Sequence, residues 1–170
     1  MPEIKGTLTY EKITAPRGHQ LLRGFSCGND KFGKGITGNV ANIYRGQAVV
    51  TVAAMTHEGK VAGVCAWQPR PLPPSTTALY RDTYIHTVGL SKEYRSCWLE
   101  DGTRISTALL TETLRQIRAD ESTNTMPGVW ALVHPFNKKG KALFASHGFA
   151  LRAPIPNHDL IFFRPPGLEP

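Results

Sequence analysis

Two side chains able to carry protons lie in the segment YIHTVGL, which runs from Tyr84 to Leu90. Tyr84 and His86 occupy alternate positions, so in an extended strand they lie on the same face. An imidazole has an ordinary pKa of about 6.5, which suits it to take up or release a proton near neutral pH. Tyr84 and His86 are therefore candidate catalytic residues. His134 and His147 are rival bases, and a histidine alone on a strand is more often structural.

A second candidate site is the segment GTRISTALL, where a loop passes into a predicted helix. The first N–H groups of a helix lack partners within it and the helix dipole is positive there, so such a start can bind an anion. The glycine and the small side chains would let a diphosphate approach the backbone, and an arginine adds charge-assisted hydrogen bonds. An ordinary capped helix start would produce the same pattern. The candidate residues are Gly102, Thr103, Arg104, Ile105, Ser106 and Thr107.

The elements that must hold these residues are strands and helices of ordinary length. Runs of β-branched and aromatic residues predict strands, and apolar residues at helical spacing predict helices. The segment QPRPLPPSTT, at 68–77, is too rich in proline for regular structure. The predicted strands are 6–13, 46–55, 61–67, 83–90, 128–134 and 157–166, with THEGK turning the hairpin between the second and third; the predicted helices are 29–44, 104–118 and the segment from Asn137 to Gly148. This order predicts an α/β fold with a mixed, mostly antiparallel sheet flanked by helices.

Composition is that of one globular domain. The chain has 170 residues, of which 41% are hydrophobic and 19% charged. No apolar run approaches the roughly 20 residues of a membrane helix. The first residues, MPEIKGTLTY, lack the pattern of a signal peptide. We therefore expect a cytoplasmic protein with no membrane partner.

Charge and cysteine content narrow the classes of ligand. The net charge is +7 and is spread along the chain, which favours an anionic partner such as a nucleic acid, a membrane headgroup or a phosphate-bearing cofactor. The three cysteines are Cys27, Cys65 and Cys97, an odd number without metal-ligand spacing. We expect reduced, structural thiols and no metal site.

The segment from Asn137 to Phe149 has the pattern N-x-x-G-x-x-x-F-x-x-x-G-F and follows a predicted buried strand. It resembles the second cofactor motif of the GNAT superfamily of acyl-coenzyme A-dependent N-acyltransferases. Upstream, VGLSKEYR is similar to the family's strand with V-x-P-x-Y-R, and GTRISTALL is similar to the end of its pyrophosphate loop. The resemblance implies a single GNAT-like domain over 1–170 that uses acetyl-CoA. It further implies that Gly89 and Leu90 pair with the pantetheine arm and that the loop from Gly102 to Thr107 holds the diphosphate. Asn137 and Phe144 would border the cofactor, although Asn137 would equally serve as a helix N-cap.

Three departures from the family pattern affect the expected chemistry. The insertion SCWLED separates Tyr94-Arg95 from Gly102, and Arg104 and Ser106 stand where the family has glycines or small residues. Phe144 stands where many members have a tyrosine, whose hydroxyl protonates the departing thiolate. Phenylalanine has no such proton, so Ser146 is a candidate replacement.

A further resemblance lies upstream in FSCGNDKF, from Phe25 to Phe32. It is similar to an element of the GNAT toxins of toxin–antitoxin pairs, which acetylate the amine of an aminoacyl group on tRNA. A turn before a core helix, with Cys27 packed, would also explain it. The acceptor is left open among aminoacyl-tRNA, a protein amine and a small amine. Many relatives are homodimers, which is the only indication of oligomeric state.

Two other classes of function compete with the acetyltransferase. A catalytically degenerate GNAT domain would bind coenzyme A or a partner without turnover, and Phe144 and Arg104 favour it. A basic nucleic-acid-binding module is the third class, and the absence of a basic stripe in the sequence speaks against it.

Overall fold

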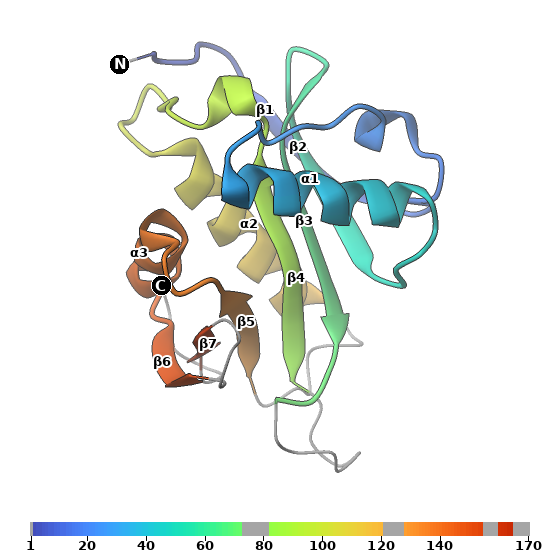
Figure 1. The fold of residues 1–170 in the computed structure, drawn as a ribbon. Coiled ribbons are helices and arrows are strands. Elements are labelled where there is room, and N and C mark those ends of the chain that lie inside the picture. Colours follow the sequence, from blue (N-terminus) through green and yellow to red (C-terminus); the bar gives the residue numbers. More distant parts are fainter. Residues whose placement is uncertain (1, 73–81, 121–127, 155–159, 165–170) are drawn as a thin grey trace. The chain divides into compact units, whose positions relative to one another are not determined.

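A computed structural model describes residues 2–72, 82–120, 128–154 and 160–164 (Figure 1). The chain forms two compact units, one of residues 1–66 with 87–113 and the other of residues 67–86 with 114–170. The helices are α1 (Lys31–Tyr44), α2 (Ile105–Ala119) and α3 (Lys138–Ser146), with short 3₁₀ helices η1 (Gln20–Leu22) and η2 (Lys92–Tyr94). The strands are β1 (Leu8–Ile13), β2 (Thr51–His57), β3 (Lys60–Pro69), β4 (Thr83–Leu90), β5 (Val129–Val133), β6 (Ala150–Pro154) and β7 (Leu160–Arg164).

The strands form a mixed, mostly antiparallel sheet, as the sequence predicts. Their order is β1-β2-β3-β4-β5-β7-β6. β1 is antiparallel to β2, and β7 is antiparallel to both β5 and β6. β4 and β5 instead pair in parallel, from Thr83 opposite Val129 to Ile85 opposite Ala131. β4 runs on past the last of these pairs to Leu90.

In the first unit, α1 forms despite three glycines because its start and end are both well capped. The Asp30 side chain accepts hydrogen bonds from the N–H groups of Phe32 and Gly33. A Cβ at Gly33 would lie 2.8 Å from the carbonyl oxygens of Cys27 and Gly28, so glycine lets the helix start pack on the preceding loop. Of the predicted apolar stripe, Val40 and Ile43 are buried in the core of this unit.

The predicted hairpin between β2 and β3 is confirmed, with a shorter first strand. Its turn is Glu58-Gly59, and both residues have positive φ, as a tight two-residue hairpin turn requires. β2 begins at Thr51 rather than at Gly46. Gly46, with φ 74°, donates to the carbonyl of Ile43 and so belongs to the C-terminal cap of α1.

The second unit contains α3, β5, β6 and β7. The α3 segment and β5 lie where the sequence predicts them. β6 was not predicted, because all five of its residues are exposed and the strand therefore shows no alternation of apolar and polar side chains. Within the described ranges, no helix has the length and apolar character needed to cross a membrane.

Candidate active site

The end of β4 is packed so closely that it requires a glycine. A Cβ at Gly89 would lie 2.4 Å from Cγ2 of Ile36 on α1 and 2.8 Å from Sγ of Cys27. Leu90 is buried, and its Cδ2 would lie 3.0 Å from a Cβ at Gly63 on β3. The two residues predicted to pair with a pantetheine arm are thus fixed by their own neighbours in the first unit.

The chain after Leu90 is bonded to β3 and to the segment from Phe25 to Phe32 of the same unit. Ser91 N–H donates to the Ala62 carbonyl and Lys92 N–H to the Ser26 carbonyl. Arg95 forms an ion pair with Asp30, and its hydrogen bond lowers the pKa of that carboxyl to about 2. The YR pair of the GNAT-like motif therefore serves partly to anchor the segment.

Tyr94 is held by a buried hydrogen-bond chain that the sequence does not reveal. The Lys5 carbonyl lies 2.7 Å from His57 Nε2 and can only accept, so Nε2 carries the proton. His57 Nδ1 then accepts from the Tyr94 hydroxyl at 3.2 Å. This chain joins the N-terminal segment, β2 and η2.

The predicted anion-binding loop uses several of its own N–H groups. Those of Gly102 and Ile105 donate to the carbonyls of Leu99 and Cys97, at 2.9 and 3.3 Å. The N–H of Thr103 donates to the Asp101 carboxylate at 2.8 Å, and this bond and one from the Thr103 side chain lower the pKa of Asp101.

Three other N–H groups at the helix start have no acceptor within the described residues, and they belong to Arg104, Ser106 and Thr107. They fit part of a diphosphate, since these are the first donors of α2 and lie at the positive end of its dipole. The Asp101 carboxylate next to them opposes an anion. Fewer N–H groups of this loop are therefore available to an anion than the sequence predicts.

The Arg104 side chain rests on an aromatic ring rather than on the loop. Its guanidinium carbon lies 4.6 Å from the Trp98 ring centroid. Trp98 is in turn held by the N-terminal segment, because its N–H donates to the Pro2 carbonyl and its carbonyl accepts from Ile4 N–H. No carboxylate pairs with Arg104 within the described ranges, so its charge is available to an anion.

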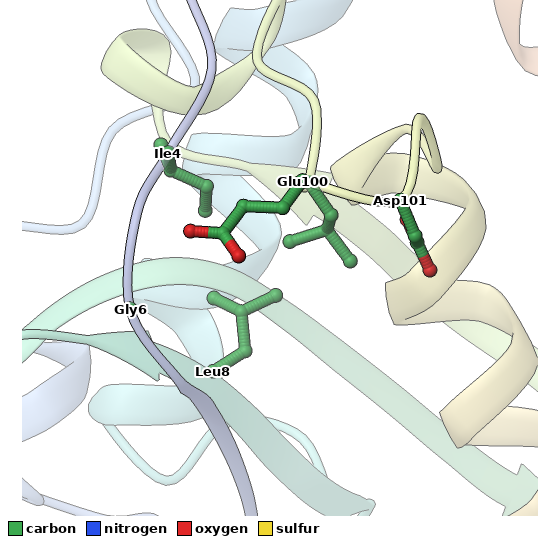
Figure 2. Close-up of a pocket in the computed structure, with 6 residues that line it drawn as sticks. Ile4, Gly6, Leu8, Glu100 and Asp101 are labelled. Atoms are coloured by element: carbon green, nitrogen blue, oxygen red, sulfur yellow. The ribbon is translucent and has the colours of Figure 1, made fainter.

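A surface cavity of about 280 Å³ lies on the other side of this loop (Figure 2). It is lined by Ile4, Gly6, Leu8, Leu99, Glu100 and Asp101. Figure 2 shows the Glu100 carboxylate directed toward the N-terminal segment, between Ile4 and Leu8. The carboxylates of Glu100 and Asp101 make the cavity unsuited to a diphosphate, and no sequence motif indicates the cavity.

In the second unit, the predicted catalytic residues belong to an aromatic cluster. The Tyr84 ring lies 4.4 Å from that of Trp130 and 6.1 Å from that of His86. The Arg70 guanidinium lies over both Tyr84 and Trp130, at 5.2 and 5.7 Å from their centroids. Trp130 and Arg70 were not among the predicted site residues, because neither lies near Tyr84 in the sequence.

His86 is half-buried on the same strand. Burial lowers its pKa below the ordinary 6.5, and the charge of Arg70 lowers it further. The imidazole is therefore neutral at physiological pH, which is the state in which it can accept a proton.

The side chains of α3 are mostly engaged within the helix. Asn137 Oδ1 accepts from Gly140 N–H at 2.9 Å, which makes Asn137 the N-cap. Phe144 is buried and packs edge-on against Phe149, with ring centroids 5.0 Å apart. The Ser146 hydroxyl donates to the Leu143 carbonyl at 2.8 Å, so it would have to leave that bond to act as an acid.

The two rival histidines also have local partners. His134 Nδ1 accepts from Phe136 N–H at 3.2 Å. His147 is buried, and its Nδ1 donates to the Leu143 carbonyl at 2.9 Å. Among the described histidines, His86 is the one that is half-buried beside a cationic side chain in an aromatic cluster.

Comparison with known proteins gives matches of structure and none of sequence. No protein-family model and no curated protein matches the chain. A tyrosine-to-phenylalanine variant of the toxin AtaT, solved with the C-terminus of the antitoxin AtaR and acetyl-CoA, has a TM-score of 0.66 at 15% identity and covers 94% of each chain.

Two further structures are similar. A protein assigned to the GNAT family, from Desulfovibrio desulfuricans, has a TM-score of 0.59 at 10% identity, over 94% of this chain and 99% of that one. Arabidopsis thaliana NAA60, solved with a bisubstrate analogue, has a TM-score of 0.57 at 15% identity, over 93% and 97%. The resemblance inferred from the motifs is confirmed at the level of structure: the chain has the GNAT fold, and its structural neighbours include GNAT toxins of toxin–antitoxin pairs.

Proposed function

We propose that residues 1–170 form one acyl-CoA N-acyltransferase domain, which moves an acetyl group from acetyl-CoA to an amine acceptor. The observation that carries the proposal is the likeness over 94% of the chain to a toxin solved with acetyl-CoA. The half-buried, neutral His86 on β4 adds a base of suitable pKa. Fold likeness alone does not fix chemistry, so the site residues must be tested directly.

The cofactor would be held mainly by the first unit. The backbone at Gly89 and Leu90 would pair with the pantetheine arm. The N–H groups of Arg104, Ser106 and Thr107 would bind the diphosphate, with added charge from the Arg104 guanidinium. Gly102, Thr103 and Ile105 would shape the loop through the bonds of their own N–H groups.

In the second unit, Asn137 is the N-cap of α3 and Phe144 is buried, and the motif resemblance is the reason for proposing both as cofactor-binding residues.

When bound, acetyl-CoA supplies a thioester whose carbonyl carbon is open to attack. The acceptor nitrogen forms the new bond to that carbon while the bond to sulfur breaks. His86 accepts the proton that the amine loses, with Tyr84 packed beside it. Phe144 has no proton to donate, so Ser146 or water would supply any proton that the thiolate product takes up.

A thiol-release assay over a panel of amines, run beside calorimetric titration with acetyl-CoA, tests the proposal. We expect saturable binding and thiol release that depends on the amine. Binding without release for any amine would instead support the degenerate GNAT domain. That alternative is favoured by Phe144 and by the loop N–H groups already bonded within the chain.

The loop conformation is tested by replacing Gly102 with valine. Gly102 has φ 80°, where a β-branched residue is strained, although nothing lies within 4 Å of its Cβ position. We expect the affinity for acetyl-CoA to fall about tenfold or more, measured by calorimetry, as the loop leaves this geometry.

The matched control is Gly24→Val. Gly24 has φ 72° and equally open surroundings, but it lies outside the loop. The Gly24→Val variant should lose a similar free energy of unfolding and keep its affinity for acetyl-CoA. Unchanged affinity in Gly102→Val would exclude this loop as the cofactor site.

The identity of the amine acceptor is a separate question. We propose aminoacyl-tRNA as one candidate, beside protein amines and small amines. Its support is the GNAT-toxin neighbours, the FSCGNDKF segment and the net charge of +7. In the structure this segment packs against α1, since Cys27 is fully buried and Asp30 caps the helix. Arrest of translation on expression would favour the toxin branch, for which we would also expect an antitoxin, like the AtaR that binds AtaT. We also propose that the protein forms a homodimer.

A further inference from the structure

Arg70 is fixed in place by both its backbone and its side chain. Its N–H donates to the Asp82 carbonyl at 2.7 Å, and its own carbonyl accepts from Trp130 Nε1 at 3.0 Å. The guanidinium lies over the Tyr84 and Trp130 rings, at 5.2 and 5.7 Å from their centroids. An arginine held in this way loses little further freedom when it binds a ligand.

No described carboxylate neutralises the charge of Arg70. The side chain is exposed, and no carboxylate pairs with it in the parts of the chain that the structure describes. The neighbouring Asp82 carboxylate is turned to the Leu72 N–H, which donates to it at 3.0 Å. A stacked guanidinium keeps its N–H donors in the plane of the group, where they match the two oxygens of a carboxylate or phosphate.

We propose that Arg70, stacked on Tyr84 and Trp130, binds an anionic group of the acceptor, either a carboxylate or a phosphate, close to the amine that is acetylated. The proposal rests on the proposed function for the identity of the amine, since His86 belongs to the same cluster. It predicts that acceptors with an anion near the amine are preferred over neutral or polycationic amines.

Binding of the anion is tested without turnover by nuclear magnetic resonance. Inorganic phosphate and, separately, acetate are titrated at constant ionic strength, with chloride as the reference salt. The Trp130 indole N–H is the reporter, because it donates to the Arg70 carbonyl. We expect a saturable shift in the wild type and none in Arg70→Gln. A shift that does not saturate, or one that is equal in Arg70→Gln, would overturn the proposal.

The control variant is Arg118→Gln, which removes another exposed positive charge of the same unit, on α2. It should keep the saturable shift. Loss of the shift in this variant as well would mean that the signal reports overall charge, and that outcome also contradicts a directed site at Arg70.

Kinetics then distinguish the two sources of the anion. Glycine is compared with glycine methyl ester for a carboxylate, and O-phosphoethanolamine with ethanolamine for a phosphate. For each pair we take the ratio of kcat/KM for the anionic acceptor to kcat/KM for its neutral partner. In the pair that carries the correct anion, Arg70→Gln should lower this ratio about ten- to a hundredfold. An equal fall for both members would mean that Arg70 acts only through His86 or through stability, and it would refute the anion site. If no amine is acetylated, the proposed function fails, while the titration still decides the anion site.

Discussion

Replacing His86 by glutamine is expected to lower kcat/KM for acetyl transfer by about 10²–10⁴-fold, the usual contribution of a general base. The imidazole lies on β4 beside Tyr84 and is half-buried. Glutamine keeps a polar side chain of similar size but cannot take a proton from the amine. The thiol-release assay measures the effect directly.

The pH dependence of kcat/KM is a second test of His86 as the base. Burial and Arg70 lower the pKa of His86 below 6.5, so the imidazole is neutral above that pH and gains a proton only at a lower one. The wild-type kcat/KM should therefore be constant near neutrality and fall as the pH drops through this lowered pKa. This acidic limb should be absent in His86→Gln.

Two variants make the result specific. His134→Gln should keep the acidic limb, because His134 directly follows β5 and its Nδ1 already accepts from Phe136 N–H. Arg70→Gln should move the limb to higher pH, since the positive charge that disfavours protonation is gone. If His86→Gln kept both its turnover and its pH profile, the base would be another residue or water.

Replacing Gly89 by alanine is expected to lower the free energy of unfolding by about 1–3 kcal/mol, the usual cost of adding a methyl group to a packed interior. The new Cβ would lie 2.4 Å from Ile36 Cγ2 and 2.8 Å from Cys27 Sγ. Ile36 is β-branched and cannot swing its Cγ2 away without changing rotamer. Urea unfolding measures the loss.

A matched glycine gives the control for this experiment. Gly38 lies in the interior of α1, and nothing lies within 4 Å of its Cβ position. Gly38→Ala should stabilise the protein by up to about 1 kcal/mol, through helix propensity. In an Ile36→Ala background the cost of Gly89→Ala should shrink, because the nearest contact has been removed. An equal effect at Gly38 and Gly89 would contradict the packing seen at the end of β4.

The helices could be predicted because their burial repeats at helical spacing, and the inner strands because they are short apolar or β-branched runs that are buried along most of their length. α2 and β4 show this, since Leu110, Leu114 and Ile117 are buried on one side of the helix and β4 has the predicted bounds. β6 could not be predicted, because an exposed strand leaves no such pattern. The N-terminal limit of β2 was missed because the cap of α1 extends into Gly46 and Gln47.

The site was predictable only as separate segments. Sequence motifs indicated the loop before α2 and the residues of β4, since their spacing is local. The contacts of Arg70 with Trp130 join residues sixty positions apart, and spacing alone does not reveal them. The bond from Thr103 N–H to the Asp101 carboxylate is local, joining residues two positions apart, but it was not predicted, and it removes one loop N–H from those open to a ligand.

The Arg104 guanidinium lies over the Trp98 ring, and the backbone of Trp98 is hydrogen-bonded to Pro2 and Ile4. These two residues precede Arg104 by about a hundred positions. His57 adds a second such link, from the Lys5 carbonyl to Tyr94. The position of the Arg104 guanidinium therefore depends on residues that are far from it in the sequence. Substitutions in residues 2–5 would therefore change the position of the Arg104 guanidinium without changing any residue from Gly102 to Thr107.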